Sequence, residues 1–266
     1  MKLKQLCLRG VVLAIVLNSF CWAGEVRVAA ASDLQFAFQE VSNRFEKATG
    51  NQVKLSFGSS GNFFTQIQNG APFDVFFSAD LDYCKKLESL GLTTPGSLYE
   101  YAVGKIVLFA PADSKLDLNK GLGVLLDPAI HKIAIANPEH APYGRAAVAA
   151  LKHENLYDKV SPKFVLGENI SQAATFVSSG AAEVGIVALS LALAPSMKDK
   201  AKYAEVPGEN YPAIAQGAVI LKSSPQQTTA NQFLEFVKSP EILKLLQSYG
   251  FSTPKKSDVK PTEEKR

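Results

Sequence analysis

Short runs of β-branched and aromatic residues alternate with longer segments of helical periodicity along most of this 266-residue chain. The first run is Val26 to Ala30, and Gly50 ends the segment after it. The apolar residues between them recur at spacings of three and four, as one face of a helix requires: Leu34, Ala37, Phe38, Val41, Phe45 and Ala48. This alternation predicts an α/β fold with mainly parallel sheets and helices on both faces.

The order of the elements predicts two similar α/β units. Further strands are expected at 53–57, 75–78, 105–110, 133–136, 164–166, 184–187 and 213–220, and two last helices at 228–237 and 240–249. If the strand near Val107 leaves the first unit and the strand near Val219 returns to it, two crossing segments connect the units. We therefore predict a first lobe of residues 24–105 and 215–254, a second lobe of residues 106–214, and a cleft between them.

The two ends of the chain differ from its body. Residues 1–23 have the organisation of a cleaved secretion signal: Lys2, Lys4 and Arg9 precede a short apolar run that ends in Cys21-Trp22-Ala23. No later segment offers the roughly 18 uninterrupted apolar residues that a membrane-spanning helix needs. Because the signal directs secretion and no later segment would hold the chain in the membrane, we expect a periplasmic protein. Phe20 directly before Cys21 argues against lipidation. Residues 255–266 are charged and nearly free of apolar side chains, which predicts a disordered tail.

The charge balance excludes some kinds of partner. The chain has 28 lysines and arginines and 25 acidic residues, and three of the basic residues lie in the predicted signal. The remainder is neutral and has no basic stripe for nucleic acid or an anionic membrane. An anion would have to be held by local dipoles and hydrogen bonds. Cys84 is the only cysteine after the signal, and without a visible Cys-His pairing we expect a buried structural thiol.

Three strand-to-helix junctions carry small, hydroxyl or glycine residues. They are Ala29 to Leu34 with Ser32, Phe57 to Asn62 with Ser60, and Asn137 to Gly144. A helix start leaves backbone N–H groups without partners and concentrates partial positive charge, so an anion can bind there. Taken singly, each serine is more often a simple helix cap. Parallel strands of one sheet, however, direct their helix starts to the same crevice.

Several segments resemble the molybdate-binding proteins of ABC-type uptake systems. The resemblance extends in order from Val26 to about Pro254 and depends on five motifs: Ala29-Ala30-Ala31-Ser32, Phe57-Gly58-Ser59-Ser60-Gly61, Gly70-Ala71-Pro72-Phe73-Asp74-Val75-Phe76-Phe77-Ser78-Ala79-Asp80, Asn137-Pro138-Glu139-His140-Ala141-Pro142-Tyr143-Gly144 and Gly185-Ile186-Val187-Ala188. It implies the type II periplasmic-binding-protein fold, in which two crossing strands act as the hinge between two α/β lobes.

The resemblance also implies a ligand set without charged side chains. By position, Ser32 and Ser60 would each give a hydroxyl and an N–H group, and Tyr143 and Ile170 would give N–H groups. Ala188 stands where some members of the family have a tyrosine that binds the anion, so we expect the Tyr143 phenol to replace that donor. The carboxylates of Asp33 and Glu168 are expected to point away from the anion.

The resemblance implies that the protein captures molybdate, with tungstate as a second ligand, and delivers it to the membrane permease of an ABC transporter. It also implies a monomer that needs no cofactor.

Another oxyanion such as sulfate or phosphate is an alternative ligand. A carboxylate facing the cleft would favour phosphate, because protonated phosphate needs a hydrogen-bond acceptor. A hydrolase is disfavoured, since Asn62 breaks the Gly-x-Ser-x-Gly pattern. A structural protein would leave the serines as helix caps. The histidines, His131, His140 and His153, are expected at the surface or in packing.

Overall fold

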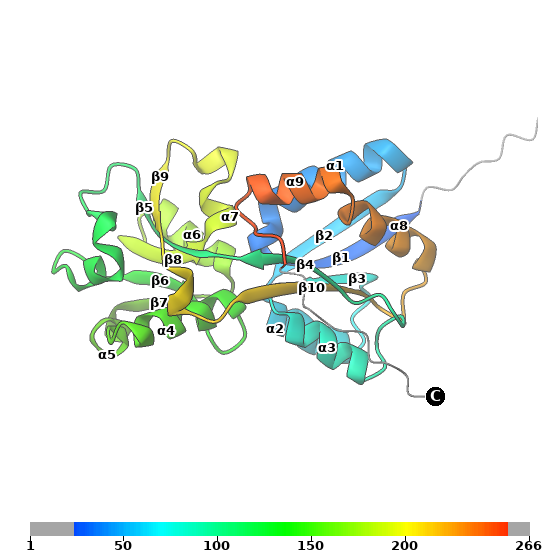
Figure 1. The fold of residues 1–266 in the computed structure, drawn as a ribbon, viewed down its shortest axis with the longest axis horizontal. Helices are drawn as coiled ribbons and strands as arrows, with labels where there is room; N and C mark the ends of the chain where they lie inside the picture. The colour runs from blue at the N-terminus through cyan, green and yellow to red at the C-terminus, as the bar shows by residue number, and fades with distance from the viewer. Residues whose placement is uncertain (1–23, 255–266) are drawn as a thin grey trace, which may run out of the picture.

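The chain forms two lobes, each built on a five-stranded sheet, in a computed structural model that describes residues 24–254 (Figure 1). The first sheet has the order β2 (Gln52–Gly58), β1 (Glu25–Ala31), β3 (Val75–Ser78), β10 (Ile214–Ile220), β4 (Tyr99–Gly104). The second has the order β7 (Phe164–Gly167), β6 (Ile133–Ala136), β8 (Val184–Ala188), β5 (Ile106–Pro111), β9 (Ala201–Glu205). The predicted signal peptide and the predicted tail lie outside the described residues.

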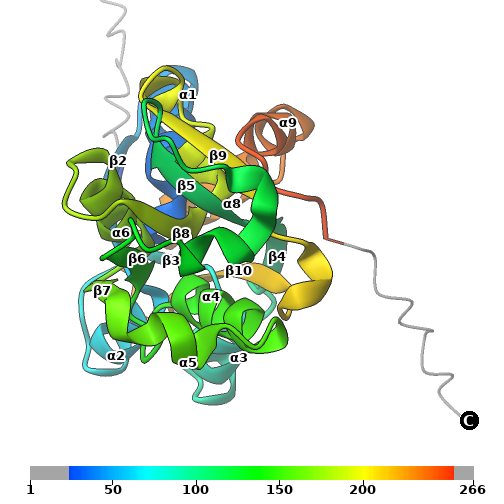
Figure 2. The same ribbon diagram turned by 90° about the vertical axis from the view of Figure 1, so that its left-hand side faces the viewer.

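Helices cover both faces of each sheet (Figures 1 and 2). The first lobe contains η1 (Ser32–Leu34), α1 (Gln35–Thr49), α2 (Ser60–Gln68), α3 (Leu81–Ser89), α8 (Gln227–Val237) and α9 (Pro240–Ser248). The second contains η2 (Leu118–Leu126), α4 (Pro142–His153), α5 (Tyr157–Val160), η3 (Ser161–Lys163), α6 (Ile170–Ser178), α7 (Leu189–Ala192), η4 (Pro195–Met197) and η5 (Gly208–Asn210). The two-lobed α/β fold expected from the sequence is confirmed.

The strands next to the lobe crossings run antiparallel to their neighbours. In the first sheet β1 is parallel to β2 and β3, whereas β10 is antiparallel to both β3 and β4. The second sheet repeats this plan, with β5 antiparallel to β8 and β9. Lys105 joins β4 to β5, and residues 206–213 join β9 to β10. Strands β5 and β10 lie inside their sheets and, apart from Gln216, are continuous apolar runs, as buried parallel strands also are. The sequence pattern therefore could not indicate that these two strands run antiparallel to their neighbours.

Two strands were missed from the sequence, β4 and β9. The stretch from Tyr99 to Gly104 includes Glu100 and ends in glycine, and the stretch from Ala201 to Glu205 contains Lys202. Neither is a run of β-branched residues, and both have partly exposed positions because they lie at the edges of their sheets. The two edge strands are nevertheless the ones that adjoin the crossings, so they matter for how the lobes are connected.

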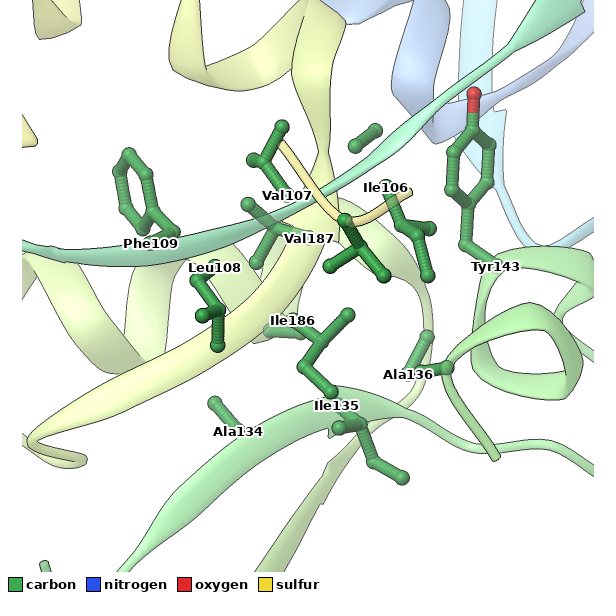
Figure 3. Packing of buried hydrophobic residues seen from close by; sticks show 14 of the residues in the cluster. Ile106, Val107, Leu108, Phe109, Ala134, Ile135, Ala136, Tyr143, Ile186 and Val187 are labelled. Atoms are coloured by element: carbon green, nitrogen blue, oxygen red, sulfur yellow. The ribbon is translucent and has the colours of Figure 1, made fainter. Parts of the chain in front are cut away.

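Apolar cores hold each lobe together. In the first lobe α1, α8 and the sheet enclose an aromatic cluster in which Phe38, Phe77 and Phe233 make edge-to-face contacts with ring centroids 4.8–6.2 Å apart. The second core gathers β5, β6 and β8, and Tyr143 stands at its end (Figure 3). Cys84 is fully buried and burial raises the pKa of its thiol, so the prediction of a buried structural thiol is confirmed. Across residues 24–254 the helices are all too short or too polar to cross a membrane.

Candidate functional site

Four helix starts, two from each lobe, surround one small hollow between the lobes. Its walls come from the starts of η1 and α2 in the first lobe and of α4 and α6 in the second. We call this space the interlobe hollow; its lining is Ala31, Ser32, Asp33, Gly58, Ser59, Ser60, Ala79, Ala141, Pro142, Tyr143 and Ile170. The structure therefore brings together four of the five predicted site residues: Ser32, Ser60, Tyr143 and Ile170.

The two serine hydroxyls already accept hydrogen bonds from backbone amides. The Ala79 N–H donates to Ser60 Oγ at 2.9 Å, and the Ser171 N–H donates to Ser32 Oγ across the lobe boundary at 3.4 Å. Both serines are almost fully buried. A hydroxyl has one hydrogen to donate and two lone pairs to accept with, so each serine keeps its hydrogen for a group inside the hollow.

Backbone amides supply the donors of the second lobe. Tyr143 and Ile170 lie in the first turns of α4 and α6, where helix geometry leaves N–H groups without intrahelical acceptors. Within residues 24–254 neither amide is bonded to another acceptor, and the Asn169 cap of α6 accepts from Gln172 instead. Both helices also direct the positive ends of their dipoles at the hollow. This combination suits an anion.

The Tyr143 hydroxyl has a different partner from the one predicted. It donates to Asp33 Oδ2 at 2.9 Å and accepts from Gln216 Nε2 at 2.9 Å, and the side chain is 2% exposed. The phenol hydrogen is thus already committed to the Asp33 carboxylate. Asp33 and Gln216 lie far from Tyr143 in the sequence, so no local pattern indicated this contact.

Asp33 is a member of the wall, although the sequence led us to expect that it points away. Its Oδ2 also accepts from Gln216 Nε2 at 2.7 Å, whereas Oδ1 has no partner in the described part of the chain. Burial raises the pKa of Asp33 from 3.8 to about 6, against the lowering effect of its bonds to Gln216 and Tyr143. Glu168 does lie apart from the hollow, and its carboxylate accepts from the Asn62 side chain.

Ala188 is not part of the lining. It ends β8, is fully buried and pairs with Ile106 of β5 at the lobe crossing. Its inclusion in the predicted ligand set came from the resemblance alone, and the structure does not bring it to the hollow. Gln216, by contrast, was not predicted, because a single glutamine within an apolar strand has no distinctive signal in the sequence.

Direct contacts between the lobes close the hollow beside Ser59. The Gly61 N–H donates to the His140 carbonyl oxygen at 3.0 Å, and Ser59 Oγ lies 2.8 Å from His140 Nδ1. A Cβ atom at Gly61 would lie 2.6 Å from that carbonyl oxygen, so the approach depends on glycine. His140 therefore packs at the lobe boundary, where it helps to cover the hollow.

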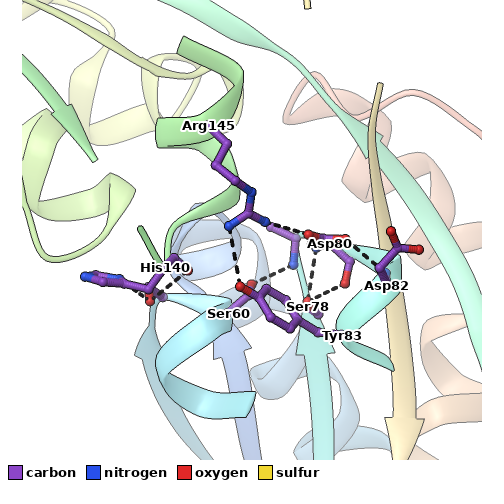
Figure 4. A network of polar contacts seen from close by, with 9 residues as sticks. Ser60, Ser78, Asp80, Asp82, Tyr83, His140 and Arg145 are labelled. Atoms are coloured by element: carbon purple, nitrogen blue, oxygen red, sulfur yellow. Dashed lines mark hydrogen bonds and ion pairs between the residues drawn. The ribbon is translucent and has the colours of Figure 1, made fainter. Parts of the chain in front are cut away.

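A larger cavity lies between α3, α4 and the start of β10. It shares Ala79 and Pro142 with the interlobe hollow. Its charged groups neutralise one another, because Arg145 bonds Asp80 across the lobe boundary at 2.5 Å (Figure 4) and Lys85 lies 3.6 Å from Asp82. The smaller hollow, lined by neither lysine nor arginine of residues 24–254, is the better candidate for an anion that neutral donors bind.

Comparisons with known proteins found relatives that match most of the chain. A family model of bacterial extracellular solute-binding proteins matches residues 26–252. A molybdate-binding protein ModA of Rhodobacter capsulatus is 39% identical over 87% of this chain and 89% of its own length. One of Azotobacter vinelandii is 40% identical over 86% and 90%. The solved structure of an Azotobacter vinelandii periplasmic molybdate-binding protein superposes with a TM-score of 0.82 at 37% identity, covering 86% of this chain and all of that one.

Proposed function

Because the chain belongs to the bacterial extracellular solute-binding protein family, we propose that it captures molybdate in the interlobe hollow and delivers it to the permease of an ABC transporter. The proposed ligands are the hydroxyls and amides of Ser32 and Ser60 and the amides of Tyr143 and Ile170. The protein acts in the periplasm as a monomer and needs no cofactor. Tungstate, which has the same shape and charge, is the second proposed ligand.

One observation carries this proposal: uncharged O–H and N–H donors from both lobes surround a single hollow. A fully ionised tetrahedral anion needs donors on every side and no acceptor. Each hydrogen bond to a charged group contributes about 1.5–3 kcal/mol, which offsets the loss of the ion's hydration when the lobes close over it. Selectivity over sulfate then follows from the size of the hollow, because the donors meet the same charge in both ions.

Asp33 supports a second candidate, a singly protonated oxyanion such as hydrogen phosphate. Its unpartnered Oδ1 belongs to a wall residue of the hollow, and a carboxylate oxygen would accept the hydrogen of a P–O–H group. A fully ionised anion would instead favour Asp33 in its protonated form. The two candidates therefore differ in whether the ligand or the carboxyl group carries the proton.

The hydrolase alternative has one feature in its favour, the contact of Ser59 with His140. The Ser59 hydroxyl, however, accepts from the Asn62 N–H as the cap of α2, and the residue is 4% exposed. The Ser59–His140 contact joins the two lobes and is formed only when they are together, so it fits a closing element better than a nucleophile. No turnover of a p-nitrophenyl ester is expected.

Isothermal titration of residues 24–266 with molybdate, tungstate, sulfate and phosphate tests the proposal. We expect saturable one-to-one binding of molybdate and tungstate and much weaker binding of the other two. Tyrosine fluorescence gives a parallel signal, because the only tryptophan is Trp22. Tighter binding of phosphate than of molybdate would favour the second candidate, and binding of none of the four would overturn both.

A further inference from the structure

A buried chain of hydrogen bonds connects the strands at the lobe crossing with the interlobe hollow. Tyr101 of β4 donates to Gln216 Oε1 of β10 at 2.6 Å. Gln216 Nε2 donates in turn to Asp33 Oδ2 at 2.7 Å and to the Tyr143 hydroxyl at 2.9 Å. Tyr143 closes the chain by donating to Asp33. We call these four side chains the hinge network; all are at most 2% exposed.

An irregularity of the sheet makes the network possible. The register between β4 and β10 shifts at Gln216 and Gly217, which face Ala102 and Glu100 respectively, so Tyr101 is the extra residue of a β-bulge. In a regular ladder Tyr101 and Ala102 would point to opposite faces, and only Ala102 would share a face with Gln216. The bulge turns the Tyr101 phenol to the Gln216 side. Both strands at the crossing thus contribute a side chain to one network.

The network is complete only while the lobes are closed. Tyr143 belongs to the second lobe and the other three members to the first (Figure 3 shows its hydroxyl at the edge of the second-lobe core). Ser190 of α7, also in the second lobe, donates to the Asp33 carbonyl oxygen at 2.7 Å. Separating the lobes would remove the Tyr143 and Ser190 donors from Asp33 and leave it bonded to Gln216, which belongs to its own lobe. Each of these lost hydrogen bonds favours the closed arrangement.

The network also touches two of the proposed ligand positions. Asp33 directly follows Ser32, and the Tyr143 amide is one of the donors proposed for the anion. Gln216 is not in the lining of the hollow, but it bonds both of these residues. Its amide is held in one orientation, because Tyr101 requires an acceptor at one end and Asp33 a donor at the other.

We propose that Gln216 is a positioning residue for anion capture: through Asp33 and Tyr143 it holds the two lobes closed around the bound ion, and Tyr101 orients it. The inference rests on the proposed function. A group that holds the closed state acts after the ion has arrived. Its loss should therefore accelerate dissociation of the anion and leave association nearly unchanged.

Stopped-flow tyrosine fluorescence with molybdate tests this with the variants Gln216→Leu and Tyr101→Phe. Gln216→Leu should dissociate about 10-fold faster than the wild type, as expected for the loss of one good hydrogen bond. Tyr101→Phe, which removes no atom from Gln216, should give a smaller change in the same direction. It keeps the inference testable if Gln216→Leu does not fold.

Two controls separate positioning from general stability. Ser224→Ala removes a buried hydrogen bond of 2.6 Å to Asp74 in the same lobe, and neither residue bonds a member of the hinge network. It should lower the melting temperature without changing the dissociation rate. In a double-mutant cycle with Tyr143→Phe, the effect of Gln216→Leu should be clearly smaller than in the wild-type background, because both changes disrupt the same network.

The outcomes are distinct. Wild-type dissociation rates in both hinge variants, or additive effects in the cycle, would overturn the role of Gln216 while molybdate binding stands. A wild-type protein that binds none of the four anions would overturn the proposed function, and the role of Gln216 in capture with it. Faster dissociation in Gln216→Leu but equally in Ser224→Ala would also overturn it, since general destabilisation would then explain both.

Discussion

The two lobes contribute to the interlobe hollow in chemically different ways. The first lobe presents side-chain hydroxyls, those of Ser32 and Ser60, whose lone pairs are engaged by backbone amides. The second lobe presents the backbone amides of Tyr143 and Ile170 at helix starts. A hydroxyl depends on the identity of one residue, whereas an amide depends on where its helix begins. The hydroxyls are visible in the sequence, and a serine-to-alanine substitution removes one by deleting a single oxygen atom. The backbone amides remain after most substitutions.

The largest effect is expected when the first lobe loses its hydroxyls. The double variant Ser32→Ala, Ser60→Ala removes two hydrogen-bond donors from the anion, each of which contributes about 1.5–3 kcal/mol. Molybdate affinity measured by calorimetry should fall by more than about 100-fold. Ser60→Ala alone should cost about 10- to 100-fold. Wild-type affinity in the double variant would mean that the two hydroxyls serve only their bonds to the Ala79 and Ser171 amides and that the second lobe holds the ion alone.

An added methyl group at the lobe boundary should have the next largest effect on molybdate affinity. In Gly61→Ala the new methyl group would lie 2.6 Å from the His140 carbonyl oxygen and 3.0 Å from its Cα. Overpacking of this kind costs about 1–3 kcal/mol, and opening of the lobes relieves it. Affinity should therefore drop about 5- to 100-fold while the unfolding midpoint in urea stays close to that of the wild type. A large loss of stability with unchanged affinity would show that the methyl group disturbs the first lobe instead.

The pH dependence of the unfolding free energy should show whether the Asp33 carboxyl group, in the wall of the hollow, is ionised. Since the pKa of Asp33 is raised from 3.8 to about 6, folding favours its protonated form. That contribution is fully present below about pH 4 and is lost as the pH rises through about 6. Relative to Asp33→Asn, which cannot ionise, the wild type should lose on the order of 3 kcal/mol of unfolding free energy between about pH 4 and pH 7. A constant difference across this range, measured by urea unfolding, would place the Asp33 pKa near its ordinary value.

The smallest effect should come from the second lobe. Ile170→Val keeps the backbone amide, the Asn169 cap and most of the buried apolar surface. Molybdate affinity should stay within about 2-fold of the wild type, with a loss of stability of about 0.5–1.5 kcal/mol. A drop comparable to that of Ser60→Ala would show that the Ile170 side chain, and not only its amide, shapes the hollow.

Much of the fold could be predicted because its signals are local. The strand from Val75 to Ser78 and the strand from Ile133 to Ala136 have the limits that the apolar runs indicated. Helix α4 begins at Pro142, which favours the first turn of a helix, within the strand-to-helix junction that the sequence indicated. The edge strands β4 and β9 were missed because a half-exposed strand need not be a continuous apolar run.

The sequence by itself determined the α/β alternation and the positions of the serine-bearing helix starts, because periodicity and capping involve residues close together in the chain. Only the tertiary structure decided that Asp33 lines the hollow, that Ala188 does not, and that the Tyr143 phenol is bonded within the protein. The contacts of the hinge network join residues 73 to 183 positions apart. Such contacts depend on how two lobes pack and on a bulge between two strands, and no local pattern specifies either.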